Sequence, residues 1–436
     1  MLVIVHDLIS VLLVLSVLFG ALMYLKLSSR PIYYLAGLII TLSLSYLFIV
    51  HLISINMGRD GFSIFVKKDL VDDKLYFYTA KLMASQLLSL GHIEKEVIFA
   101  FQTSEFGYDS PKSLYFSALA VPLYLIFPEA GTLGFKSLNI LFFCIAVLLL
   151  VRELLDESDN RRQTLAEVNV SWYAFLFAIF ISFYPTLLIR LVQIEKDVFL
   201  FSLFSIGFIC LLHKVNGRGT LFKGICLSLI IVILIFYRPQ FSLVLLFSYI
   251  YLVLFKTKSF KVFFLQLAVV IVLIPIPLLL LKSYFPDVFT ILVAIKSYSV
   301  LAGATDVIAV DYESVLGIYK TIGTSLYFYL FAPISIYALK ANALWKVMML
   351  EPILFFLIPF LVCLFSYKKV KNGSYLLMLG IVISIILALL SVYYESHVGS
   401  YMRKRLPLYA MWIFLGFYFA KHRNKVLKNE KNSSDL

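Results

Sequence analysis

Residues 169–213 read NVSWYAFLFAIFISFYPTLLIRLVQIEKDVFLFSLFSIGFICLLH, two apolar stretches with the charges Glu195, Lys196 and Asp197 between them. Charged residues make up only 14% of the chain, so three in a row stand out. A charge at membrane depth costs about 2.5–3.5 kcal/mol on insertion scales. We therefore expect this triplet to lie at a membrane–water boundary or to line a water-filled cavity.

Apolar stretches of the same kind recur along the 436 residues, which are 62% hydrophobic with a mean hydropathy of +0.95. About 20 apolar residues cross a hydrocarbon core of about 30 Å, whereas barrel strands alternate over about 10 residues. The sequence thus predicts an all-α, polytopic membrane protein with about 11–13 transmembrane helices. The expected spans are 4–25, 33–54, 134–151, 169–190, 197–213, 221–237, 239–255, 262–282, 351–367, 374–394 and 405–420.

The expected organisation is a single polytopic domain, 1–420, followed by a basic, polar, cytoplasmic tail, 421–436, that is disordered from residue 429. The segment 4–25 lacks a basic start and a cleavage site, so we interpret it as a retained span. Larger loops are expected at about 55–112 and 283–347. The shorter apolar stretches 113–127 and 324–339 each contain a proline and are typical of re-entrant or interfacial helices.

The distribution of charge predicts the orientation. If the short loops and the tail are cytoplasmic, that side holds 19 basic and 7 acidic residues, whereas the other side holds 19 basic and 18 acidic. Cytoplasmic loops are enriched in Lys and Arg, so this assignment fits. Both larger loops and the triplet then lie on the outer face. The same enrichment explains the net charge of +13, so no nucleic-acid partner is expected.

The four cysteines all fall in apolar stretches and are interpreted as packing residues. No Cys/His ligand spacing occurs, so no metal site is assigned. The sequence assigns no cofactor and leaves a divalent metal open.

Three groups of charged residues are candidates for chemistry on the outer face. Asp72 and Asp73 precede an amphipathic stretch, 77–90, with Asp72 as the expected N-cap and Asp73 in the first turn. They either serve only that helix end or act on an acceptor hydroxyl as a general base.

The second group is Arg190, Glu195, Lys196 and Asp197. It is either a helix-end anchor with an internal ion pair, or a site in which cations face a leaving phosphate and a carboxylate faces an acceptor or a metal.

The third group is basic: Arg238 at a proline break, and Arg403 and Arg405 before the last span. Arg238 is a snorkelling interfacial arginine or a phosphate ligand. An outer-face basic cluster runs against the positive-inside trend, so Arg403 and Arg405 either reflect a local topology error or bind an anionic headgroup or pyrophosphate.

In order along the chain, these motifs resemble the GT-C superfamily of polyprenol-dependent membrane glycosyltransferases, including O-antigen and capsule (Wzy-type) repeat-unit polymerases. The resemblance rests on short motifs over most of the chain. They are Asp72-Asp73 with Tyr76, Ser110-Pro111-Lys112-Ser113-Leu114-Tyr115, Tyr184-Pro185 with Glu195-Lys196-Asp197, Arg238-Pro239, Phe331-Ala332-Pro333 with Glu351, and Arg403/Arg405 with Pro407. Asp72-Asp73 departs from the spaced D-x-D of metal-binding members, which puts metal dependence in doubt.

The resemblance implies transfer of a sugar or oligosaccharide from an undecaprenyl phosphate or diphosphate to a glycan acceptor, at the periplasmic face of a bacterial inner membrane. The catalytic candidates are Asp72, Asp73, Asp197 and Glu195, and the phosphate-binding candidates are Arg190, Lys196, Arg238, Arg403 and Arg405. The expected partners are the polyprenyl-linked saccharide, the acceptor, membrane lipid and other polysaccharide-assembly membrane proteins. Joining of repeat units in lipopolysaccharide or capsule synthesis is the leading hypothesis. A single-sugar transferase and a lipid-linked oligosaccharide flippase are the alternatives.

Overall fold

The computed structural model describes residues 2–24, 30–62, 64, 67–106, 114–155, 172–254, 262, 283–284, 314–331, 350–370, 372–394 and 403–434. Every regular element in these ranges is helical, which confirms the predicted all-α class. The chain divides into two compact units, Met1–Ile206 and Gly207–Leu436. The expected span 262–282 lies outside the described residues, apart from residue 262.

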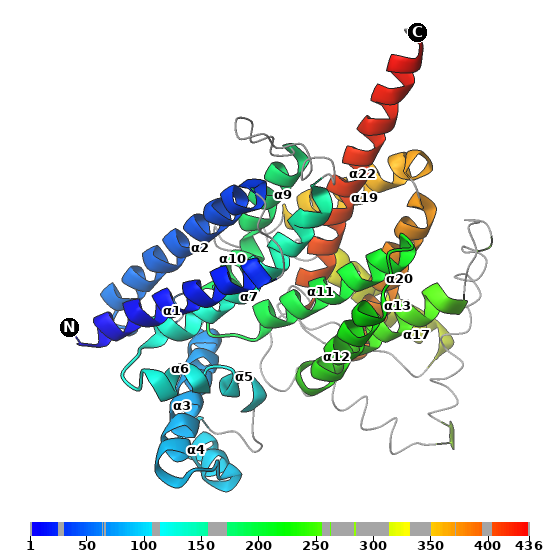
Figure 1. The fold of residues 1–436 in the computed structure, drawn as a ribbon. Coiled ribbons are helices and arrows are strands. Elements are labelled where there is room, and N and C mark those ends of the chain that lie inside the picture. The colour runs from blue at the N-terminus through cyan, green and yellow to red at the C-terminus, as the bar shows by residue number, and fades with distance from the viewer. Residues whose placement is uncertain are drawn as a thin grey trace. The chain divides into compact units, whose positions relative to one another are not determined.

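The first unit is built around one long, buried helix (Figure 1). That helix, α7 (Thr132–Leu154), contacts α1 (Leu2–Tyr24), α2 (Arg30–Asn56), α9 (Trp172–Ser182) and α10 (Pro185–Leu191). Asp7 of α1 accepts a hydrogen bond from the backbone N–H of Gly134 at 3.2 Å, in the first turn of α7. A carboxylate there satisfies a donor that has no partner within the helix and complements the helix dipole.

A second group of helices in the first unit lies in and just after the expected larger loop 55–112 (Figure 1). It comprises α3 (Lys67–Leu90), α4 (Lys95–Phe106), α5 (Leu114–Ala118) and α6 (Val121–Ile126). Because α3 begins at Lys67, Asp72 lies in its interior, and the prediction that Asp72 is an N-cap is wrong. Its neighbour Asp73 is not in the first turn either. The segment 113–127 forms two short helices, α5 and α6, with Pro122 at the start of α6.

The predicted single span 169–190 is broken. Its two halves, α9 and α10, are bent by 65° at Phe183 and Tyr184. Tyr184 is extended, with ψ of 110°, because the residue before a proline is disfavoured in the helical region. Pro185 then starts α10, where its missing N–H has no cost.

The second unit packs its helices around α20 (Gly373–Tyr394) and α22 (Leu406–Ser434). It also contains the longer helices α12 (Leu221–Tyr237), α13 (Pro239–Leu254), α17 (Val315–Phe331) and α19 (Ile358–Ser366), and the short helices η2 (Pro352–Leu357) and η3 (Tyr367–Lys369). Trp412 is fully buried and donates its indole N–H to Ser384 Oγ at 2.9 Å, which joins α22 to α20. The helix α11 (Asp197–Val215) begins in the first unit and ends in the second.

The structure changes two expectations, one for the C-terminal tail and one for the stretch 324–339. The tail is helical as far as Ser434, so the prediction of disorder from residue 429 is wrong. Of the predicted stretch 324–339, the described part belongs to α17, which starts earlier, at Val315, and residues 332–339 lie outside the described residues.

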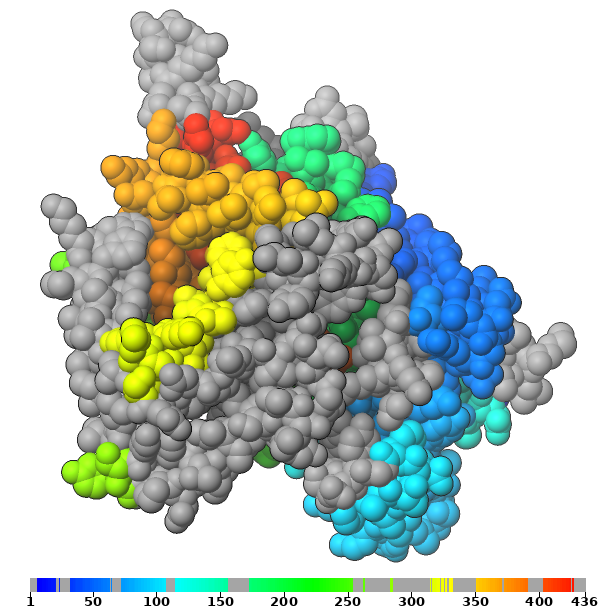
Figure 2. Space-filling view, turned by 180° about the vertical axis from the view of Figure 1, so that it is seen from behind, coloured from blue at the N-terminus to red at the C-terminus, as the bar shows by residue number. Residues whose placement is uncertain are grey.

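Apolar side chains cover the outside of the long helices. In the described residues, five helices are long and apolar enough to cross a membrane, or six if the bent pair α9–α10 counts as one span. Only 33% of the best such window in α2 is buried, and Ile49, Leu52 and Ile55 point outward. Figure 2 shows the surfaces of α2 (blue) and residues 350–370 (orange). Water penalises such bands and lipid does not, so the chain is a polytopic helical membrane protein. The count of 11–13 spans stays a prediction.

Candidate functional site

The turn between α10 and α11, residues 192–196, is the centre of the candidate site. Gln193 and Ile194 are fully buried and Glu195 nearly so. A non-helical segment exposes backbone N–H and C=O groups that need partners when they are buried. Side chains from distant elements supply them.

Asp73 of α3 accepts a hydrogen bond from the backbone N–H of Ile194 through Oδ1, at 2.9 Å. Asn139 of α7 donates through Nδ2 to the carbonyl oxygen of Gln193, at 2.6 Å. Asp73 and Ile194 are 121 residues apart in the chain. The structure therefore brings Asp73, from the first larger loop, to the backbone just before the charged triplet, which the sequence places in a separate segment.

A buried lysine accompanies Asp73. Lys136 of α7 is fully buried, and its Nζ donates to the carbonyl oxygen of Gly61 at 2.6 Å. Its positive charge interacts with the carboxylate of Asp73 and with His51 of α2. A buried charge needs an opposite charge and hydrogen bonds. Lys136 and Asp73 thus compensate each other at the same place as the 192–196 turn.

Arg190 and Glu195 form an ion pair across the 192–196 turn. Arg190 NH1 lies 2.8 Å from both carboxylate oxygens of Glu195 and 2.8 Å from Oε1 of Gln193. The side chain of Arg190 is 11% exposed and that of Glu195 is 4% exposed. This is the internal ion pair that the sequence left as one alternative. The pair connects the last turn of α10 to the 192–196 turn.

The remaining candidates of the first unit, from both the Asp72–Asp73 pair and the 190–197 group, differ in exposure. Asp72 in α3 and Asp197 in the first turn of α11 are buried, whereas Lys196 is partly exposed. The four carboxylates of these candidates therefore lie inside, and the two cations, Arg190 and Lys196, reach the surface of the unit. Asp197 lies in the first turn of α11, where a carboxylate complements the helix dipole.

The three basic candidates of the second unit have different surroundings. Arg238 is partly exposed and lies between α12 and α13, where Pro239 starts the second helix. Arg403 is partly exposed, just before α22. Arg405 is fully buried, 3.6 Å from Glu351 Oε2, with its guanidinium 4.8 Å from the ring centre of Tyr409. Arg405 thus has a packing role in this structure, and its predicted phosphate binding stays a prediction.

Sequence reasoning did not single out Lys136, Asn139 or Gln193. Their signal was present, because Lys136 and Asn139 are polar residues inside an otherwise apolar span, and an ionisable residue there points to a functional site. Their partners lie elsewhere in the chain and are visible only in the fold.

Among the described residues, no group of three or more His, Cys, Asp or Glu side chains is arranged to hold a metal ion. The four cysteines are free. Comparison of the chain with protein-family models, with curated proteins and with solved structures found no match.

Proposed function

We propose that the chain is a membrane glycosyltransferase that uses a lipid-linked sugar donor, and that it joins repeat units carried on undecaprenyl diphosphate. The observation that carries the proposal is the hydrogen bond from Ile194 to Asp73. It unites two segments that the sequence singles out for the same chemistry. Burying a cluster of carboxylates and cations inside an apolar protein costs free energy. Such buried charged clusters are typical of functional sites.

In the proposed reaction, a carboxylate takes the proton of an acceptor hydroxyl while the hydroxyl oxygen attacks the anomeric carbon of the donor sugar. The bond from that carbon to the phosphate oxygen breaks, and its electron pair leaves with the phosphate. Asp72 and Asp197 are the proposed bases, since Asp73 is held by the turn backbone. Glu195 acts through Arg190, which it holds in place.

Negative charge develops on the departing phosphate. A preorganised cation next to it therefore stabilises the transition state more than the ground state. Lys196 and Arg190 are partly exposed beside the buried carboxylates and are suited to this role. Arg238 and Arg403 belong to the second unit and stay phosphate-binding candidates from the sequence. A donor carried on a lipid reaches such residues from the bilayer, which fits the apolar outside of the long helices.

The test is gel analysis of surface glycan from bacterial cells that carry the gene deletion and express either the wild-type chain or the variants Asp72→Asn, Asp73→Asn and Asp197→Asn. We expect long-chain glycan to be lost at unchanged protein level in Asp72→Asn and Asp197→Asn, which remove the proposed bases, and to be shortened in Asp73→Asn, which alters the group that positions the turn. Glu96→Gln in α4 is the matched control, because Glu96 is an exposed carboxylate outside the site. Normal glycan in all three Asp variants would remove the catalytic assignment.

The deletion strain separates the alternatives. Glycan capped after a single repeat indicates a polymerase. Full-length glycan that lacks one sugar indicates a single-sugar transferase, and lipid-linked repeats held on the inner leaflet indicate a flippase.

A further inference from the structure

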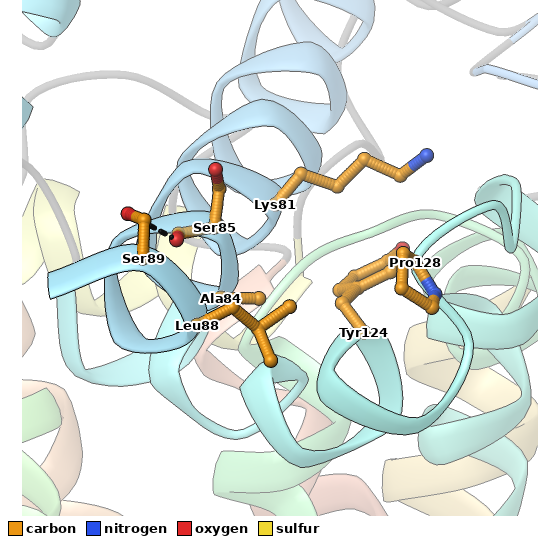
Figure 3. Close-up of a pocket in the computed structure, with 7 residues that line it drawn as sticks. All are labelled: Lys81, Ala84, Ser85, Leu88, Ser89, Tyr124 and Pro128. Carbon is orange, nitrogen blue, oxygen red and sulfur yellow. Dashed lines mark hydrogen bonds between the residues drawn. The ribbon is translucent and has the colours of Figure 1, made fainter. Parts of the chain in front are cut away.

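A pocket of 430 Å³ lies between α3 and α6, apart from the 192–196 turn (Figure 3). Small-molecule sites have volumes of about 300–1,000 Å³, so this pocket has the size for a ligand of one or two sugar rings. None of its lining residues belongs to the candidate site described above. The proposed function gives it no role.

Lys81 is the only charged residue among the described residues that line the pocket. Its Nζ lies 5.1 Å from the ring centre of Phe77 and 5.6 Å from that of Tyr124, at cation–π distance. Burial lowers the pKa of Lys81, and the more distant carboxylates of Glu129 and Asp7 oppose that shift. In the described part of the chain, Lys81 forms no ion pair. Its ammonium group is therefore held by these two aromatic rings.

The rest of the lining alternates hydroxyl groups and apolar surface. Ser85 and Ser89 follow Lys81 at four-residue intervals, so the three share one face of α3. Both serines are exposed, and Ser89 donates to the carbonyl oxygen of Ser85 at 2.8 Å. Across the pocket, Figure 3 shows Tyr124 beside Pro128. The Tyr124 hydroxyl donates to the Gly131 carbonyl at 3.3 Å, which fixes the ring.

We propose that this pocket binds an acidic sugar of the glycan, with the sugar carboxylate on Lys81 and its hydroxyls on Ser85 and Ser89. A pyranose ring has apolar C–H faces and a polar rim. An aromatic wall opposite a row of hydroxyls suits both. An ammonium group that no carboxylate of the described residues pairs with suits a sugar carboxylate. That the ligand is a saccharide rests on the proposed function. That the ligand is acidic rests on the pocket alone.

The test measures the binding of two probes to the full chain in lipid nanodiscs by ligand-observed NMR. The probes differ only at C6, where methyl β-glucuronide has a carboxylate and methyl β-glucoside has a hydroxymethyl group. The wild-type chain should bind the glucuronide about tenfold more tightly, because a charge-assisted hydrogen bond forms only with the acid. Lys81→Gln should abolish that preference, and Lys81→Arg should retain it. Ser85→Ala should weaken both probes equally.

Lys95→Gln in α4 is the matched control, since Lys95 is an exposed lysine that does not line the pocket. Equal binding of the two probes to the wild-type chain, or an undiminished glucuronide preference in Lys81→Gln, overturns the inference. Inorganic phosphate that displaces the glucuronide at lower concentration reassigns the pocket to a phosphate and also overturns it. These readouts are independent of the Asp197→Asn glycan result, so the proposed function and this pocket fail separately.

Discussion

Gly61 shows at the scale of one residue why the site needs a particular amino acid. Its φ is +83°, which L side chains rarely adopt, and its carbonyl oxygen accepts from Lys136. A Cβ at this position would contact Thr132 Oγ1 and would lie 2.5 Å from His51 Cε1. The backbone approaches α7 and α2 this closely only because position 61 carries no side chain.

We expect Gly61→Ala to destabilise the protein more than Gly58→Ala. Both positions have positive φ, so either alanine lowers the free energy of unfolding by about 1–2 kcal/mol through left-handed backbone strain. A Cβ at Gly58 meets open space, whereas a Cβ at Gly61 also meets its neighbours. The measurement is the thermal unfolding midpoint of each variant in detergent. Equal shifts would show that the crowding around Gly61 carries no cost.

Asp73 offers a second comparison at the scale of one residue. Asp73→Ala leaves the buried N–H of Ile194 without its acceptor, so we expect a loss of about 1–3 kcal/mol in the free energy of unfolding. Both Asp73→Ala and Asp73→Asn also remove the counter-charge of the buried Lys136, but Asp73→Asn keeps an oxygen in the same place, so we expect the smaller loss for Asp73→Asn. Denaturant titration of both variants checks the order. An alanine variant as stable as the wild-type chain would rule out the positioning role.

At the scale of the element, the sequence predicts helix bounds well where a breaker follows an apolar stretch. The expected spans 221–237 and 239–255 correspond to α12 and α13, because Pro239 starts the second helix. The N-cap assigned to Asp72 is wrong because α3 already starts at Lys67. The partner of its neighbour Asp73 is Ile194, and no local pattern indicates a contact over 121 residues.

The α9–α10 bend was missed because the apolar stretch continues through it. Hydropathy measures length and composition, and neither changes at Phe183 and Tyr184. Pro185 was the available signal, and its effect depends on whether neighbouring groups satisfy the freed backbone.

The Arg190–Glu195 pair leads to a prediction for the turn as an element. Glu195→Gln and Arg190→Met each leave one group of a mostly buried pair uncompensated, so we expect each to cost about 3–5 kcal/mol. The double variant should cost less than the sum of the two, because neither charge is then left behind. A double-mutant cycle of unfolding free energies is the measurement. Additive losses would show that the two side chains do not interact energetically.

At the scale of the whole molecule, charge predicts opposite sides of the membrane for two exposed turns. We expect an impermeant maleimide added outside intact cells to label Gly91→Cys in the turn after α3, and to spare Gly217→Cys in the turn after α11. Both variants are made in a background without the four native cysteines, and labelling after lysis is the control. The reverse pattern would invert the topology.

For the whole molecule, composition alone predicted the class, since a 62% hydrophobic chain has to bury its helices in lipid or in each other. For the candidate site, the sequence indicated the charges but not their pairing. Lys136 and Asn139 join them because α7 is central in the first unit, and that position follows from packing.

The Asp73–Ile194 bond also constrains how the protein is made. Ribosomes add about 5–20 residues per second, so the 121 residues between these partners take on the order of ten seconds. Throughout that interval Asp73 has been synthesised and Ile194 does not yet exist. Lys136, the buried counter-charge of Asp73, is synthesised about halfway through. The nascent chain must therefore hold α3 in water, or on its insertion machinery, until the last part of its own site has been synthesised.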